Sequence, residues 1–198
     1  MPIRIGLVVE GTGDVEAAPL FARRVGLATR VTTYIHIPTP VRVPRSRLIK
    51  DGELERAIEL AAAKVDGEGG VIVLIDADDD CPAELGPVLL ARAASAARGR
   101  FPVAVALARS EFESWFIAGI VSLRGARSLR NDVQPVAEPE LIRDAKGWLA
   151  KNMARGYSEV LDQPAFASEV DIAAARAGSD SCNKFCRELE RLIDELRR

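Results

Sequence analysis

The sequence predicts one α/β domain built on a mostly parallel, four-stranded sheet with helices on both faces. Short runs of apolar and β-branched residues alternate along the chain with longer segments of helical periodicity, which is typical of parallel sheets covered by helices. The chain has 198 residues, 48% hydrophobic and 28% charged, which is enough to bury one core. We expect a Rossmann-like sheet of order 2-1-3-4, followed by a helical C-terminal extension.

The first unit is a strand, a tight turn and a helix. Residues 3–9 form an apolar run that ends in Glu10. The stretch Gly11-Thr12-Gly13-Asp14 then breaks the strand and opens the helix. Residues 31–37 predict the second strand.

The middle of the chain continues the alternation. Residues 38–50 hold three prolines, three arginines and a lysine and predict a long exposed loop. Apolar positions spaced three and four apart predict a helix over residues 54–65. Residues 71–75 are a continuous apolar run, as in strands buried on both faces. A helix over residues 85–97 and a fourth strand over residues 101–108 follow.

Predicted strands are absent after residue 121. The remaining sequence predicts helices near residues 139–153 and over residues 183–197. We therefore expect an α/β core, residues 1–121, and a helical extension, residues 122–198, that packs on the core.

Composition excludes several classes of protein. No window approaches the ~18 apolar residues of a membrane span, and the N-terminal strand reaches an acid too soon for a secretory signal, so we expect a cytoplasmic location. Cys81, Cys182 and Cys186 are too scattered for a zinc site and predict structural thiols. The net charge of -2 argues against a general polyanion binder.

Acidic residues follow two strands that the expected order makes neighbours. Glu10 ends the first strand and Asp76 ends the third, so both would lie at the crevice where open α/β sheets bind ligands. Asp78 would point the same way as Asp76 if the extended backbone continued. Carboxylates packed this closely need a compensating cation, and oxygen ligands favour Mg²⁺ or Mn²⁺ over zinc.

These residues carry a resemblance to a known fold family. A strand ending in Glu10-Gly11 with Asp14 beyond it, and a later strand ending in Asp76-x-Asp78, resemble the Toprim signature of topoisomerases, DnaG-type primases, OLD-family nucleases and small ribonucleases. The resemblance implies a metal-dependent phosphodiester site. Glu10 would act as general acid or base or as a metal ligand, Asp14 would join the metal-binding set, and Asp76 and Asp78 would hold Mg²⁺.

Later segments are similar to a family of Toprim-like proteins of unknown function, DUF4276. The similarity lies in Glu111-x-Glu113-Ser114-Trp115, in the loop of residues 42–50, and in residues 156–159 with Asp162-Gln163. By this resemblance, Glu111 or Glu113 is the extra acid that OLD-like nucleases use near a second metal. The sequence offers no chemical role for Tyr157, Asp162 and Gln163.

A phosphate-binding surface is expected beside the acids, because arginine forks suit phosphate oxygens. The expected phosphate or nucleic-acid contacts are Gly11, Thr12, Gly13, Arg42, Arg45, Arg47 and Lys50. Structural interpretations stay open: the glycine turn lacks the lysine of a P-loop, and the basic residues fit an ordinary exposed loop. The acids after the third strand could form a solvated turn, and Glu111 and Glu113 could simply favour a helix N-terminus.

The predicted function is a free-standing nuclease that uses Mg²⁺ or Mn²⁺. In it, two cations bound by Asp76, Asp78, Glu10 and Glu113 would activate water. The gate domain of a topoisomerase, the further domains of a primase and the ATPase half of OLD nucleases have no counterpart here, so an ATPase partner would be a separate polypeptide. A role in defence against phage follows from the resemblance alone. Two alternatives stay open: a non-catalytic module that binds nucleic acid or an ATPase, and a phosphatase or nucleotide hydrolase.

Overall fold

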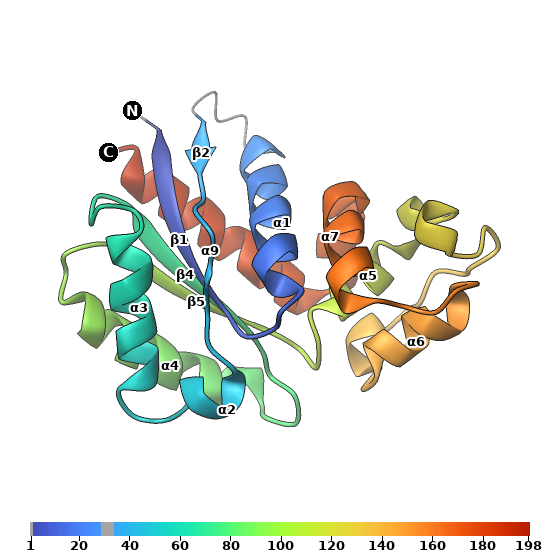
Figure 1. Ribbon diagram of the computed structural model, residues 1–198, viewed down its shortest axis with the longest axis horizontal. Coiled ribbons are helices and arrows are strands. Elements are labelled where there is room, and N and C mark those ends of the chain that lie inside the picture. Colours follow the sequence, from blue (N-terminus) through green and yellow to red (C-terminus); the bar gives the residue numbers. More distant parts are fainter. Residues whose placement is uncertain (1, 29–33) are drawn as a thin grey trace.

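A parallel sheet forms the centre of the protein (Figure 1). The computed structural model describes residues 2–28 and 34–198. Four strands follow the order β2-β1-β4-β5, and a short fifth strand, β3, also pairs with β1. Every pair is parallel. The strands are β1 (Ile3–Val9), β2 (Ile35–His36), β3 (Val41–Arg42), β4 (Gly70–Asp76) and β5 (Val103–Ala108).

The predicted α/β architecture with a mostly parallel sheet is confirmed, but the strand order differs in detail. Instead of one second strand over residues 31–37, two short strands pair with β1, β2 near its start and β3 near its end. Residues 31–33 of the predicted strand lie outside the described residues. Pro38 and Pro40 separate β2 from β3, because proline has no N–H to donate to a ladder.

Helices cover both faces of the sheet (Figure 1). On one face, α1 (Asp14–Ala28) and α9 (Asp180–Leu196) share a core with the sheet, and on the other face α3 (Glu53–Ala63) and α4 (Pro82–Ala97) do so. Successive side chains of a strand point to opposite faces, so Leu7 and Val9 join the first core and Val8 the second. All of β4 is buried, as its continuous apolar run predicts.

The helical segment after residue 121 contributes to the sheet's own core. Helix α9 packs on β4 and β5 and beside α1, and it buries Phe185, Leu189 and Leu192 completely. The division at residue 121 stays a prediction, but α9 completes one face of the sheet. The other helices of this region lie to the right of the sheet in Figure 1 or beside α5. They are α6 (Ala145–Asn152), α7 (Glu159–Glu169) and α8 (Ile172–Gly178), whereas α5 (Glu113–Ala118) precedes residue 121.

Two predicted segments need correction. Residues 38–50, predicted as a loop, contain β3 and the short helix α2 (Arg45–Leu48). The helix predicted near residues 139–153 is divided into a 3-10 turn, Pro139–Leu141, and α6, because Ile142 between them has a non-helical ψ of 107°. The Asp144 side chain then starts α6 by accepting a hydrogen bond from the backbone N–H of Gly147, at 2.8 Å.

Helices α7 and α8 are not predicted from the sequence. Pro164 interrupts the helical signal of α7, and α8 is a short alanine-rich helix without a stripe of large apolar residues. Both form because Phe166 and Ala175 are buried in the shared core. Over the described parts of the chain, no helix is long and apolar enough to cross a membrane.

Removing α9 tests whether the α/β core folds without the C-terminal region. A chain that ends at residue 121 leaves Ile72, Leu74 and the rest of one sheet face without the cover of Leu189 and Leu192. We expect it to lose cooperative thermal unfolding, measured by circular dichroism, because this uncovered apolar area removes much of the driving force for folding. A chain lacking Arg197 and Arg198 is the control and should melt like the full protein. Cooperative melting of the shortened chain would establish an independent core.

Candidate active site

Two acids end neighbouring parallel strands and lie at the same edge of the sheet. Glu10 follows β1, Asp76 is the last residue of β4, and the two strands pair directly. Glu10 Oε2 accepts a hydrogen bond of 3.3 Å from the backbone N–H of Asp76. Asp76 is 7% exposed, and its Oδ1 accepts a hydrogen bond of 2.9 Å from the N–H of Phe112. The structure therefore brings Glu10 and Asp76 together at the predicted crevice.

Asp14 is buried in the turn between β1 and α1. Its Oδ2 accepts a hydrogen bond of 2.8 Å from the N–H of Gly11, and its Oδ1 accepts one of 2.8 Å from Nε2 of Gln163 on α7. A Cβ at Gly13 would lie 2.0 Å from Oε1 of Gln163, so glycine is required where α7 approaches the turn. Because both Asp14 oxygens are hydrogen-bonded, its present role is to close the turn and fix α7 against it.

Asp78 does not point the same way as Asp76. The extended backbone ends at Asp76, and Asp78 takes a left-handed conformation with φ of 51°, beside Ser110, whose φ is 63°. The N–H of Asp78 donates to the carbonyl of Ser110 at 3.3 Å. Asp78 and Ser110 are both non-glycine residues in the left-handed region, and they follow adjacent strands. Such local backbone strain clusters at functional sites. The Asp78 carboxylate is about half exposed and lies 3.6 Å from Nε of Arg45.

The side chain of Arg45 binds backbone carbonyls at the end of β4 and in the loop that follows. Its Nε donates to the carbonyl of Asp76 at 3.0 Å and its Nη2 to the carbonyl of Ala77 at 3.3 Å, while Nη2 also pairs with Asp80. The guanidinium predicted to bind phosphate is thus already engaged with the protein. A fork that spans two carbonyls and an acid fixes the position of the acidic loop.

Of the other predicted phosphate contacts, Gly13 is buried and Gly11 is partly buried, and the rest lie on the surface. Arg47 pairs with Glu53 at 2.7 Å. Arg42, Lys50 and Thr12 are exposed. Arg42 is the register partner of Val9, the residue before Glu10, so its backbone lies near the end of β1.

Of the two candidate acids after β5, Glu113 is the one that enters the site. Its side chain is fully buried, and it adds to the negative charge around Asp76. Glu111 is partly exposed, and its Oε2 accepts a hydrogen bond of 3.1 Å from the N–H of Lys146. The sequence could not show which of the two acids is buried, because Glu111 lies just before α5 and Glu113 is its first residue.

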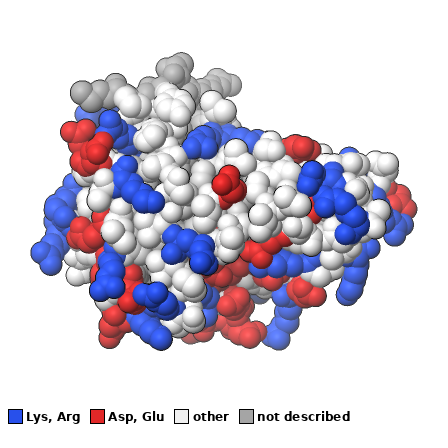
Figure 2. Space-filling model, viewed as in Figure 1, with Lys and Arg blue, Asp and Glu red and all other residues white. Residues whose placement is uncertain are grey.

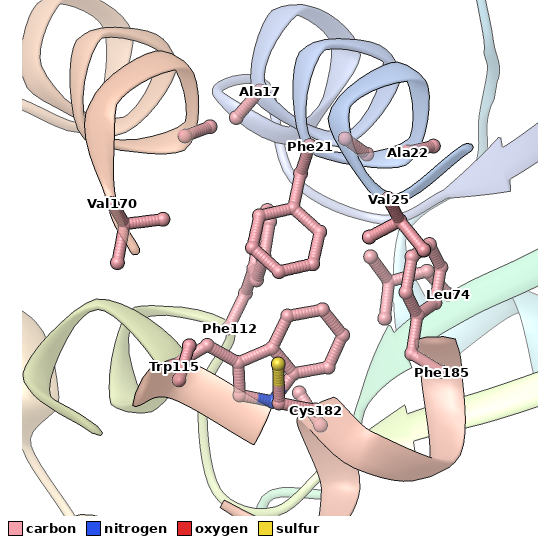
Figure 3. Packing of buried hydrophobic residues seen from close by; sticks show 14 of the residues in the cluster. Ala17, Phe21, Ala22, Val25, Leu74, Phe112, Trp115, Val170, Cys182 and Phe185 are labelled. Atoms are coloured by element: carbon pink, nitrogen blue, oxygen red, sulfur yellow. The ribbon is translucent and has the colours of Figure 1, made fainter. Parts of the chain in front are cut away.

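An aromatic cluster fixes the segment that carries Glu113 (Figure 3). The ring of Phe112 packs edge-on against Trp115 at 4.7 Å between centroids and against Phe21 of α1 at 6.0 Å. Trp115 also packs against Phe185 of α9 at 5.3 Å, and its Nε1 donates to Oγ of Ser181 at 2.8 Å. Because the N–H of Phe112 binds Asp76, this packing sets the position of both acids.

Lys146 of α6, Tyr157 before α7 and Glu159 at the start of α7 complete the site. The sequence assigned none of them a role. The Tyr157 hydroxyl donates to Oε1 of Glu113 at 3.0 Å. The ammonium of Lys146 lies 3.8 Å from Glu111, 4.0 Å from Glu113 and 3.9 Å from Glu159. Lys146 carried no signal that singled it out, because isolated charged residues on helices are usually solvated. Glu159 lies in the segment similar to DUF4276, but the sequence assigned it no role.

Asp162 holds the segment before α7 in place. It is fully buried and accepts a hydrogen bond of 2.8 Å from the N–H of Ser158. It also pairs with Arg127 at 2.9 Å and with Arg155. Asp162 therefore anchors the start of α7, the helix that presents Glu159 and Gln163 to the site.

Burial and mutual repulsion keep protons on the acids. Burial raises the pKa of Glu10 to about 7, and the carboxylate of Asp14 adds to the shift. Burial raises the pKa of Glu113 to about 8, although Lys146 opposes the change. Burial, followed by the charges of Glu10 and Glu113, raises the pKa of Asp76 well above its usual range. Burial lowers the pKa of Lys146, but the carboxylates of Glu113 and Glu159 outweigh it, so the net shift is upward.

The carboxylate side chains described above are suitable ligands for a divalent cation, but in this structure they are not grouped closely enough to form a metal site. All are carboxylates, and Oε2 of Glu113 is buried without a hydrogen-bond partner. Within residues 2–28 and 34–198, however, no three Asp, Glu, His or Cys side chains form a group that could hold a metal. The ammonium of Lys146 compensates part of the charge instead. Metal binding therefore stays a prediction.

Comparison with known proteins identifies a family. The model of a domain of unknown function, DUF4276, matches residues 9–190. The match includes every residue of the site described above. No curated protein and no solved structure matches the chain. The comparisons thus support the resemblance to DUF4276, while the relation to Toprim and OLD nucleases stays a prediction.

Replacing Glu113 with glutamine should change how stability depends on pH. The pKa of Glu113 is about 8 in the folded protein against an ordinary value of 4.5, so the folded state keeps a proton that the unfolded state has lost between these values. Stability should fall as pH rises through this window. Glu113→Gln should remove on the order of 3 kcal/mol of that fall between about pH 5 and about pH 8, measured by urea unfolding. Glu10 and Asp76 would account for the remaining slope.

Glu111→Gln is the matched control, because it also removes a carboxylate near Lys146 but from a partly exposed position. It tests whether losing a partner of Lys146 is enough to produce the effect. If both variants change the slope equally, or if Glu113→Gln leaves it unchanged, the buried charge of Glu113 does not govern the pH dependence.

Proposed function

The chain belongs to the DUF4276 family, and we propose that it is a metal-dependent phosphodiester hydrolase, a nuclease of the Toprim type that uses Mg²⁺ or Mn²⁺. One observation carries the proposal. Glu10 and Asp76 lie at the carboxyl ends of parallel strands, Glu113 adds its charge to theirs, and all three have raised pKa values. Oε2 of Glu113 is buried without a hydrogen-bond partner, 4.0 Å from the Lys146 ammonium. Such a site is short of positive charge, which a divalent cation would supply.

The residues divide into three roles. Asp76, with Glu10 or Glu113, would hold the cation, and Asp78 at the exposed rim would join them when substrate binds. Once bound, the cation would supply the charge that activates water and stabilises a leaving oxygen. Glu10, with a pKa of about 7, can take up or release a proton at neutral pH, as a general acid or base must.

The supporting residues keep this arrangement in place. Tyr157 orients the buried carboxylate of Glu113, and Gln163 holds Asp14 and through it the turn after Glu10. Lys146 neutralises part of the charge between Glu111, Glu113 and Glu159. Each of these groups limits the freedom of a carboxylate that would otherwise move away from its neighbours.

Nucleic acid is the proposed substrate. Figure 2 shows basic and acidic side chains interspersed over the face in view, which fits a strand held at one point better than one bound along a broad basic surface. Exposed Arg42, next to the end of β1, and exposed Lys50, on the same segment of the chain, would contact its phosphates. A separate ATPase as partner and a role in defence against phage extend the proposal on the resemblance to OLD nucleases.

The test is cleavage of labelled single- and double-stranded DNA and RNA with Mg²⁺, Mn²⁺ or a chelator. We expect metal-dependent cutting that Asp76→Asn and Glu10→Gln each reduce by roughly 100-fold or more, because each removes a group that must bind the cation or transfer a proton. Asp79→Asn is the control, since Asp79 is a neighbouring acid whose side chain is 90% exposed. It should cut at the wild-type rate.

Metal binding is measured separately, as the rise in melting temperature on adding Mn²⁺ without nucleic acid. Wild type and Asp79→Asn should both show the rise, and Asp76→Asn should not. Normal cutting by Asp76→Asn would refute the assignment of the site. A folded protein that binds Mn²⁺ but cuts none of the four substrates would instead favour a non-catalytic module that binds nucleic acid or an ATPase.

A further inference from the structure

The free edge of β5 opens into a cleft of about 910 Å³ that adjoins the carboxylate site at the acidic loop, where Asp78 belongs to both, but does not include Glu10, Asp76 or Glu113. Strand β5 is the last in the order of the described sheet. At its two ends, the carbonyls of Pro102 and Ala108 accept hydrogen bonds from β4 or the residue after it. Backbone groups of a parallel strand alternate in direction, so the N–H and C=O groups of Val105 and Leu107 point away from β4, toward the cleft that these residues line.

Side chains close this edge at both ends but not in the middle. Arg191 Nη2 donates to the carbonyl of Val103 at 3.0 Å. At the other end, the N–H of Arg109 donates to Oγ of Ser181 at 3.2 Å. Between these two contacts, β5 presents strand-like donors and acceptors, which are a template for a further strand.

The cleft has one apolar wall and one charged wall. Helix α4 contributes Gly86, Pro87 and Leu90, and α9 contributes Asp180 and Lys184. Val105 and Leu107 belong to the core under α4 and are each 3% exposed, so they form the floor of the cleft between its two walls. A strand added to β5 would point alternate side chains at α4 and at α9.

We propose that this cleft binds an extended peptide segment of a partner protein, which adds to β5 as a parallel or antiparallel strand and carries apolar residues alternating with charged ones. Its apolar side chains would pack on Pro87 and Leu90, and its charged side chains would pair with Asp180 and Lys184. Main-chain hydrogen bonds would supply affinity and the two walls would supply specificity.

Two other occupants fit the cleft less well. A second copy of this chain cannot pair its β5 with this one, because in each copy the edge lies between the α4 and α9 walls of the cleft, and the walls of the two copies would meet before the strands did. A nucleic-acid strand meets a lining in which acids outnumber bases, and its phosphates would be repelled. The acidic residues are Asp78, Asp79, Asp80, Glu140 and Asp180, and the basic ones are Arg109, Arg143 and Lys184.

The experiment selects peptides of about eight residues from a random display library on the full chain, since strands of this length suit one edge. Selected peptides are synthesised and their binding is followed by amide hydrogen exchange. We expect the enriched sequences to alternate apolar and charged residues and to protect the amides of Val105 and Leu107.

Gly86→Leu should fill the cleft and weaken binding by at least about tenfold. Gly86→Ala is the matched control, because its Cβ would meet Leu107 Cδ1 at 3.6 Å, an ordinary contact, and it should bind like the wild type. Leu90→Asp is a second variant, which changes an exposed side chain of the apolar wall and should weaken binding without unfolding the chain.

Three results would overturn the proposal. These are the absence of any selected peptide that protects Val105 and Leu107, protection that survives in both Gly86→Leu and Leu90→Asp, and equal protection by a single-stranded oligonucleotide. The last result would assign the cleft to nucleic acid. None of these outcomes depends on whether the protein cleaves phosphodiesters.

Discussion

Several carboxylates buried at one edge of a parallel sheet set the main physical constraint on this protein. Glu10 and Asp76 lie together because β1 and β4 pair directly, and Glu113 lies near them because Phe112 binds Asp76 through its backbone. Buried acids repel each other and lose hydration, so they raise one another's pKa values. The surrounding structure supplies hydrogen-bond donors and the ammonium of Lys146. The negative charge that these groups leave uncompensated is the basis of our proposal that the site binds a cation.

The C-terminal helices pack around the strand ends and supply groups that bind the buried acids. Lys146 of α6 and Gln163 of α7 contact acids that belong to the α/β core. Helix α9 covers the sheet and contributes Phe185 to the aromatic cluster that holds Phe112 and Trp115. Core and extension are therefore coupled: the same packing that completes the hydrophobic face also positions the site.

Sequence patterns predicted much of the fold because strands and amphipathic helices have local periodicities. The continuous apolar run before Asp76 indicated a buried strand, and the spacing from Leu54 onward indicated α3. The patterns failed where local signals are weak or misleading. Prolines suggested a loop over residues 38–50, although backbone pairing with β1 forms β3 there, and Pro164 concealed α7.

The sequence by itself determined that acids end two neighbouring strands, since Glu10 and Asp76 each follow an apolar run and parallel strands end at one edge. Only the tertiary structure decided which other groups join them. It buried Glu113 and left Glu111 partly exposed, and it ended the extended backbone before Asp78, which lies at the exposed rim. It also brought in Lys146, Tyr157, Glu159 and Gln163. The reason is distance along the chain, since Gln163 and Asp14 are 149 residues apart. Periodicity describes only neighbouring residues, so it cannot predict a contact formed by long-range packing.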